Sequence, residues 1–281
     1  MVVFPNIKIN LGLQVLRKRD DGYHDISTVM IGVDWTDVLE IVPALDGVEK
    51  LVVSGLPVNC PPEKNLVMKA VNAVRERVVK LPEVHVFLHK NVPDGAGLGG
   101  GSSDAAFTIL ALNELFDLGL NRPEMADIAT HIGSDCPFFI YNIPMLASGR
   151  GEILEPLHDL GSILSKFKVA IVKPVDVSVS TAVAYAGVIP SDNRQSIVEC
   201  LKYKTTDWRK NLVNDFEESV FKHCPETGVI KDKMYALGCV YAAMSGSGSA
   251  VFGIFEPEAL ERIEFEKIFP GCVCHTGSFI V

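Results

Sequence analysis

The sequence has 281 residues, and none of its apolar runs approaches the roughly 20 residues that a membrane-spanning helix needs. Its first residues, MVVFPNIKIN, lack the basic region and long apolar core of a signal peptide. Seven cysteines are scattered without a disulfide framework, and the one close pair, Cys272 and Cys274, is a poor zinc or disulfide signature. These absences favour free thiols in a reducing cytoplasm and no membrane partner.

Positive charge is also scarce, because 26 Lys and Arg stand against 35 Asp and Glu, for a net charge of -9. This balance argues against nucleic-acid binding, which needs a basic face. It permits a phosphorylated ligand, which needs only a local group of donors and a lysine or two. The chain also lacks internal repeats, low-complexity tracts and a His/Cys/Asp/Glu cluster for a structural metal.

The spacing of apolar residues predicts strands and helices in a mixed order. In the first half, strands are predicted over 6–16, 27–43, 51–58 and 83–93, and helices over 65–78, 104–119 and 123–133, with a new strand starting in 134–140. In the second half, strands are predicted over 166–174 and 272–281, helices over 178–188, 208–221 and 228–238, and a small-residue turn running into a strand over 242–255. We expect two domains, residues 1–155 and 156–281.

The segment PDGAGLGGGSSDAA, residues 93–106, follows a predicted strand and opens a predicted helix. Glycine lets a ligand approach the backbone, and successive amides together with the first helical turn bind an anion. Ser102 and Ser103 add hydroxyls, one of which can cap the helix. No lysine precedes Ser102, as a P-loop requires, and Ser102 stands where G-x-G-x-x-G needs its last glycine. A flexible turn is the alternative.

The same residues resemble the phosphate loop of the GHMP kinases, whose pattern is P-x-x-x-G-L-G-S/G-S-S. Other segments are similar, in the right order, to family members that phosphorylate the C2 hydroxyl of 4-diphosphocytidyl-2-C-methylerythritol in the non-mevalonate isoprenoid pathway. These segments are PNIKINLGLQVLRKRDDGYHDISTVM, EKNLVMKA, IGSDCPFFI, GRGEILEPL, NDFE and SGSGSAVFGIF. The D-G-Y-H element is the most specific of them.

The resemblance implies an α+β fold of two domains, with ATP and substrate meeting between them. The N-terminal domain would be ribosomal-protein-like, with a left-handed β-α-β crossover, and the C-terminal domain ferredoxin-like. The implied activity is an ATP-dependent kinase acting on an alcohol, with Mg²⁺ arriving on ATP, as a monomer or weak homodimer. A homoserine- or mevalonate-type kinase and a non-catalytic phosphate-binding module are the alternatives.

For catalysis, the resemblance implies a pair of charged residues. Asp135 would accept the proton of the substrate hydroxyl or orient that hydroxyl. Lys8 would lie beside Asp135, keep it ionised and stabilise the developing charge. From the residues alone, Asp135 can also be a helix or turn cap, and Lys8 can point outward to solvent.

For the cytidylyl substrate, the resemblance implies a stacking site. Tyr23 would stack on the cytosine, His24 would bond its edge, Tyr185 would form a second wall and Thr181 would lie nearby. Ordinary helix packing is the alternative for Tyr185.

Two further substrate contacts are implied. Asn10 shares a strand face with Lys8 and would bond the erythritol or phosphate groups. Gly246 lies in the small-residue loop Ser245 to Ser249, which would complete the pocket. The alternatives are a polar edge residue for Asn10 and a simple tight turn for the loop.

The implied ATP site combines the glycine loop with the regions around the adenine and ribose. Its members are Pro93, Asp94, Gly95, Ala96, Gly97, Leu98, Gly99, Gly100, Gly101, Ser102 and Ser103, with Asn65, Leu66 and Lys90. Asn65 can instead be only an N-cap, and Lys90 only a surface charge. Asp104 is expected either to point away from the phosphates or to reach Mg²⁺ through water.

Overall fold

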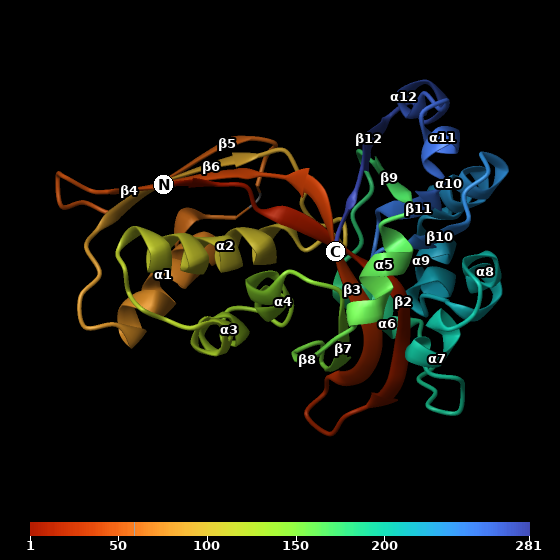
Figure 1. The fold of residues 1–281 in the computed structure, drawn as a ribbon, viewed down its shortest axis with the longest axis horizontal. Coiled ribbons are helices and arrows are strands. Elements are labelled where there is room, and N and C mark those ends of the chain that lie inside the picture. The colour runs from red at the N-terminus through yellow and green to blue at the C-terminus, as the bar shows by residue number, and fades with distance from the viewer. Residues whose placement is uncertain (59) are drawn as a thin grey trace. The chain divides into compact units, whose positions relative to one another are not determined.

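The computed structural model describes residues 1–58 and 60–281, which form two compact units (Figure 1). Unit 1 combines Met1–Ile7, Trp35–Asp94 and Gly99–Asn142, and unit 2 combines Lys8–Asp34, Gly95–Leu98 and Ile143–Val281. The predicted boundary at residue 155 separates two continuous stretches of sequence, whereas each compact unit consists of three separate segments. That boundary therefore stays a prediction.

Unit 1 has one four-stranded sheet with the order β1-β4-β6-β5, and helices α1 and α2 lie together on one side of it (Figure 1). Its elements are β1 (Val2–Val3), β4 (Val38–Pro43), β5 (Lys50–Gly55), η1 (Pro62–Lys64), α1 (Leu66–Arg77), β6 (Val84–Lys90), α2 (Gly100–Leu115), α3 (Arg122–Thr130) and α4 (Cys136–Tyr141). Strands β5 and β6 are parallel neighbours joined through α1, which is a β-α-β unit. Its left-handed sense stays a prediction.

Helix α1 shows why the sequence forms these elements. Its buried residues are Val67, Ala70, Val71 and Val74, spaced as one face of a helix requires. The Asn65 side chain accepts a hydrogen bond from the Val67 amide at 3.0 Å, which satisfies a donor of the first turn. The predicted helix and its N-cap are confirmed, and the cap stabilises the helix by about 1 kcal/mol.

Unit 2 has two sheets. One has the order β10-β11-β9-β12 with all neighbours antiparallel, which is the ferredoxin-like arrangement, and the other has the order β13-β3-β7-β8 with β2 paired to β3. The strands are β2 (Asn6–Lys18), β3 (His24–Thr36), β7 (Met145–Gly149), β8 (Ile153–Pro156), β9 (Lys168–Pro174), β10 (Tyr241–Met244), β11 (Val251–Phe255), β12 (Cys272–Gly277) and β13 (Phe279–Ile280). Residues 6–7 of β2 and 35–36 of β3 belong to unit 1. The helices are α5 (His158–Leu164), α6 (Thr181–Ala186), α7 (Ile197–Leu201), η2 (Thr205–Asp207), α8 (Trp208–Asn211), α9 (Phe216–His223), α10 (Pro225–Ala236), α11 (Pro257–Leu260) and α12 (Phe265–Ile268).

Two predicted elements are wrong, and two predicted strands are each divided between two sheets: 27–43 into β3 and β4, and 272–281 into β12 and β13. The strand predicted to start in 134–140 is helix α4, which packs on α2 and α3. A short apolar run does not distinguish a buried strand from a buried helix, and Pro137 suits a first helical turn. The single helix predicted over 208–221 is divided into α8 and α9, because the segment between them pairs with β2 through Leu13.

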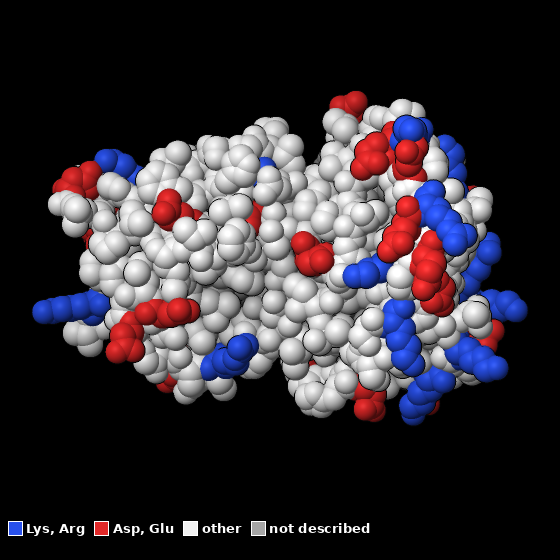
Figure 2. All heavy atoms as spheres, turned by 45° about the horizontal axis from the view of Figure 1, so that its top comes forward, with Lys and Arg blue, Asp and Glu red and all other residues white. Residues whose placement is uncertain are grey.

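The surface mixes both signs of charge. Figure 2 shows Lys and Arg side chains interspersed with Asp and Glu on the face that it draws. All seven cysteines are free thiols, as expected. Among the described residues, each helix is too short or too polar to cross a bilayer.

Asn214 ties the segment before α9 to the loop after β10. Its Nδ2 donates to the carbonyls of Met244 and Gly246, both at 2.8 Å, and its Oδ1 accepts from the Phe216 amide at 3.0 Å. The residue is buried, so these bonds have no competition from water. Asn214 therefore fixes the position of the loop that contains Gly246.

We predict that Asn214→Ala lowers the free energy of unfolding by about 1–3 kcal/mol, because it leaves buried carbonyls without a donor. Urea unfolding followed by circular dichroism measures this loss. Asn211→Ala is the control, since Asn211 is half-buried and donates one bond, to the Asp207 carbonyl. Equal stability losses in the two variants would contradict the role of Asn214.

Candidate active site

The middle of the glycine loop, Gly95–Leu98, is held by its own unit. The Lys8 amide donates to the Leu98 carbonyl at 2.9 Å, and the Ser245 hydroxyl donates to the Gly97 carbonyl at 2.9 Å. Gly97 has a positive φ of 76°, and a Cβ atom there would overlap the Ser245 carbonyl. The segment is therefore held by hydrogen bonds and requires glycine at position 97, which favours a defined loop over the alternative of a flexible turn.

Gly246 lies against the same segment. A Cβ atom on Gly246 would be 3.1 Å from the Gly97 carbonyl oxygen and 3.2 Å from Oδ1 of Asn10. The loop Ser245 to Ser249 is a tight turn between β10 and β11, which is the simpler of its two interpretations. It also packs on the glycine loop. Unit 2 thus brings together Asn10, Gly97 and Gly246, which are far apart in sequence.

Lys8 and Asn10 point inward from β2. Their exposed fractions are only 3% and 2%. The alternative that Lys8 points outward to solvent is therefore wrong, and so is the alternative that Asn10 is a polar edge residue. Lys8 Nζ donates to Asn10 Oδ1 at 2.5 Å, and Asn10 Nδ2 donates to Thr28 Oγ1 at 3.0 Å. The Thr28 hydroxyl then donates to the Gly12 carbonyl at 2.6 Å. This buried chain of bonds fixes the Lys8 ammonium in unit 2, next to the backbone that supports Leu98.

The rest of the loop opens α2 in unit 1. Gly99 takes the N-cap position with a φ of 71°, and no side chain caps the helix. Ser102 and Ser103 lie inside the first turn, so the expectation that one of them is the cap is wrong. The left-handed glycine starts the helix four residues before the predicted start at Asp104. The Ser103 amide donates to the Gly99 carbonyl at 2.9 Å, whereas the amides of Gly100, Gly101 and Ser102 have no acceptor within the helix and lie at the positive end of its dipole.

Asp135 stands at the N-cap position of α4 and is half-buried. Its side chain makes no capping hydrogen bond, so the interpretation as a helix cap is wrong. The next residue, Cys136, is in hydrogen-bonding contact with Ser102 in the first turn of α2. Burial raises the pKa of the Cys136 thiol to about 12, so this thiol stays protonated. Unit 1 therefore holds the start of α4 against the start of α2.

Lys90 is buried and is not the surface charge that one interpretation allowed. Its ammonium donates to Asp104 at 2.7 Å and also to Asp37. Asp104 thus points to Lys90, and its orientation relative to the phosphates and Mg²⁺ stays a prediction. Asp37 was missed, because an isolated acid in the strand-like stretch 27–43 gives no sign of a distant lysine.

The other residues predicted to bind ATP lie near the glycine loop in sequence or in unit 1. Asn65 caps α1, and Leu66 Cδ1 would be 3.7 Å from a Cβ atom on Gly101. Pro93 is half-buried and Asp94 is exposed, at the end of their unit 1 segment. Roles for these residues in ATP binding stay predictions.

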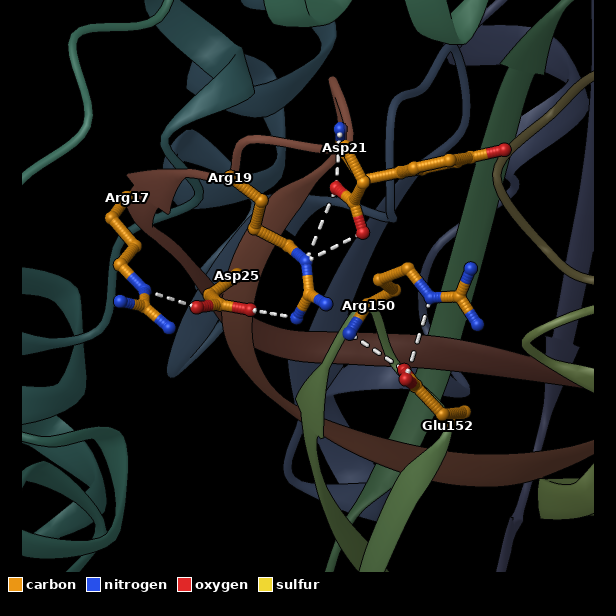
Figure 3. A network of polar contacts seen from close by, with 7 residues as sticks. Arg17, Arg19, Asp21, Asp25, Arg150 and Glu152 are labelled. Carbon is orange, nitrogen blue, oxygen red and sulfur yellow. Dashed lines mark hydrogen bonds and ion pairs between the residues drawn. The ribbon is translucent and has the colours of Figure 1, made fainter.

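The turn between β2 and β3 is braced by charged residues (Figure 3). Asp21 accepts the Tyr23 amide at 3.1 Å and the Arg19 guanidinium at 3.0 Å, and Arg19 also bonds Asp25 at 2.8 Å. The backbone hydrogen bond from Tyr23 and the contact with Arg19 lower the pKa of Asp21. The network fixes the backbone at Tyr23 and leaves its side chain 58% exposed.

Arg150, in the turn after β7, was missed in the sequence. Its guanidinium lies over the Tyr23 ring, 5.3 Å from the centroid, and its backbone amide bonds Glu152 at 2.6 Å. Figure 3 shows Arg150 and Glu152 beside the Arg19–Asp21 pair. The only available signal was the segment GRGEILEPL, which carries both residues without indicating Tyr23 as a neighbour.

His24 and Tyr185 form a ring stack that the sequence did not predict. Their centroids are 4.6 Å apart with an angle of 17° between the planes, and Tyr185 also meets the Phe216 ring edge-on at 4.7 Å. Thr181 Oγ1 lies 3.5 Å from the Ser247 hydroxyl. Unit 2 therefore groups the predicted pyrimidine residues from β3 and α6 with the loop after β10.

Comparisons with known proteins agree on one family. The family model for the GHMP kinases N terminal domain matches residues 65–142, and the GHMP kinases C terminal model matches 198–266. A 4-diphosphocytidyl-2-C-methyl-D-erythritol kinase of Porphyromonas gingivalis is 47% identical, over 96% of this chain and 97% of its own length.

Solved structures agree as well. The crystal structure of a 4-(cytidine 5'-diphospho)-2C-methyl-D-erythritol kinase is 31% identical, covers both chains in full and has a TM-score of 0.83. The mevalonate kinase of Methanococcus jannaschii, at 17% identity over 100% of this chain and 98% of its own, has a TM-score of 0.76 and shares the fold. With the motifs in their expected order and both family models matched, the chain belongs to the GHMP kinases, and within them to the 4-diphosphocytidyl-2-C-methyl-D-erythritol kinases.

Proposed function

We propose that the chain transfers the terminal phosphate of ATP to the C2 hydroxyl of 4-diphosphocytidyl-2-C-methyl-D-erythritol, giving the 2-phosphate and ADP. This reaction is a step of the non-mevalonate isoprenoid pathway. The observation that carries the proposal is the phosphate-loop backbone at Gly97, packed against Gly246 and next to the buried pair Lys8 and Asn10. The protein acts on a small molecule, as a monomer or weak homodimer in the cytoplasm.

The ATP phosphates bind along residues 93–103, mainly through backbone amides that include those at the start of α2. This end of a 16-residue helix presents unsatisfied N–H groups and a partial positive charge. Asn65 and Leu66 lie around the adenine and ribose, while Lys90 was predicted for the same region. Because Lys90 already bonds two carboxylates, we propose that it stabilises the backbone beneath the phosphate loop and does not contact a phosphate directly.

Asp135 accepts the proton of the attacking hydroxyl or orients that hydroxyl. Lys8 stabilises the negative charge that develops as the phosphoryl group moves, in surroundings largely shielded from water. Positioning and charge stabilisation are most of what phosphoryl transfer requires.

The substrate binds mainly through unit 2. Tyr23 stacks on the cytosine. His24 bonds the pyrimidine edge, and the imidazole ring of His24 is oriented by stacking on Tyr185. Thr181, Asn10 and Gly246 contact the remaining polar groups of the substrate.

Mg²⁺ would bind together with ATP and would neutralise part of the phosphate charge. The residues fit an ion held by phosphate oxygens and water, because the Asp104 carboxylate near the start of α2 is already engaged by Lys90.

ADP release from ATP tests the function against its alternatives. With 4-diphosphocytidyl-2-C-methyl-D-erythritol, homoserine and mevalonate as acceptors, we expect turnover with the first alone. Turnover with homoserine or mevalonate instead would contradict the substrate. ATP binding without any turnover would contradict a kinase and favour a binding module.

We predict that Asp135→Asn lowers kcat by about 10²- to 10⁴-fold, because the amide cannot accept the proton. Binding of the cytidylyl substrate, measured by calorimetry, should be retained. Asp127→Asn on α3 is the control, since Asp127 is exposed in the same unit. A variant at 135 that keeps most of its rate would show that the base is assigned wrongly.

We predict that Tyr23→Ala weakens binding of the cytidylyl substrate by about 1–3 kcal/mol, as loss of base stacking does. The affinity for ATP should not change. Tyr203→Ala is the control, because Tyr203 is also exposed and contacts Gln195 instead. Unchanged substrate affinity in the Tyr23 variant would rule out stacking.

A further inference from the structure

Three charged side chains meet in the interior of unit 1. Lys90 ends β6, Asp37 lies between β3 and β4, and Asp104 belongs to the first turns of α2. Their side chains are 5%, 1% and 2% exposed, and Lys90 Nζ donates to both carboxylates. We name these residues the Lys90 cluster. With all three ionised, its net charge is negative, which is costly in the interior unless each group is well bonded.

The two carboxylates are bonded unequally. Asp37 accepts from Lys90 and also from the backbone amides of Asn91 at 2.6 Å and Val92 at 2.9 Å. One oxygen of Asp104 accepts from Lys90, whereas its Oδ1 is buried and has no hydrogen-bond partner among the described residues. Hydrogen bonds favour the ionised form, so Asp104 is the member of the Lys90 cluster that takes a proton more readily.

The electrostatics agree with this difference. Burial raises the pKa of Asp104 to about 7, Lys90 opposes the rise, and the Asp37 charge adds to it. A neutral Asp104 can share its proton with Asp37, an arrangement typical of paired carboxylates. Lys90 and Asp37 are the charged groups that act on it in the described part of the chain. Helix α1 brings apolar side chains towards α2, and α4 brings the protonated thiol of Cys136.

The Lys90 cluster lies directly under the phosphate loop. A Cβ atom on Gly100, the first residue of α2, would be 3.5 Å from Lys90 Nζ. The amides of this first turn are the ones that have no acceptor within the helix. An anion bound to them therefore adds negative charge beside a buried group that is already net negative when Asp104 is ionised.

We propose that Asp104 is a positioning residue of the nucleotide site and takes up a proton when the phosphates of ATP bind at the start of α2. The inference rests on the proposed function, because it requires ATP at this end of the helix. The bound phosphates favour the neutral form of Asp104, and the neutral form in turn favours the phosphates.

The direction of the pH dependence follows from this coupling. Below the pKa of the free protein, Asp104 is already protonated and binding takes up no proton there. As the pH rises through about 7, ATP affinity weakens by up to roughly tenfold per pH unit, with up to one proton taken up. Above the raised pKa of the complex, both effects end.

Calorimetry of ATP binding with Mg²⁺, in buffers of different ionisation enthalpy between pH 7 and 9, measures the uptake directly. For Asp104→Asn, which keeps the neutral shape, we expect this uptake to be lost and the affinity to stay near the low-pH value of the unaltered protein. The nucleotide's own titration is common to both proteins and cancels in the difference. Asp127→Asn, an exposed carboxylate paired with Arg77, should behave like the unaltered protein.

Equal proton uptake by the unaltered protein and Asp104→Asn would overturn the proposal. If that variant does not fold, the unaltered protein decides alone, because no uptake and a flat affinity between pH 7 and 9 would also overturn it. Failure of the unaltered protein to bind ATP would overturn the proposed function and this inference with it.

Discussion

The close approach of two backbones at Gly97 is the constraint on which the candidate site depends. A side chain there would overlap the Ser245 carbonyl, so the glycine loop and the loop after β10 meet with nothing between them. Glycine carries a large entropic cost on folding, and hydrogen bonds from Lys8 and Ser245 offset it by holding the segment in one conformation. A loop fixed in this way presents its amides without further ordering, and pre-organised donors are what a developing phosphoryl charge needs.

Buried charge is arranged differently within each of the two units. In unit 2, Lys8 is held by the amide oxygen of Asn10, within a chain of bonds that ends on the backbone of Gly12. In unit 1, Lys90 is held by two carboxylates, so its charge is neutralised inside the protein. The two lysines therefore lie in different surroundings. Lys90 is fixed beneath the start of α2 by two carboxylates, and under the proposed function Lys8 acts on the reacting groups.

Local sequence predicted the parts of the fold that local physics determines. Helix α1, its Asn65 cap and the alternation of β6 were predictable, because periodicity and capping act within a few residues. Helix α4 and the break between α8 and α9 were not, since packing on α2 and pairing with Leu13 decide them. The glycine loop was identified from its residues, and the family resemblance added Lys8 and Asp135. Asp37 and Arg150 were missed, because their partners Lys90 and Tyr23 lie more than fifty residues away.

Substrate choice cannot come from the fold, because kinases acting on other alcohols share it. It must come from side chains on that fold, and the turn between β2 and β3, where we propose that the cytosine binds, carries a network of charged residues around Tyr23. Arg19 and Asp21 fix the backbone at Tyr23, while Arg150 lies over its ring. Exposed ion pairs contribute little stability individually, so this network is better explained by the order that it imposes. An aromatic ring already held in place loses less entropy when a base stacks on it. This smaller entropic cost would strengthen the binding of substrates that carry a base.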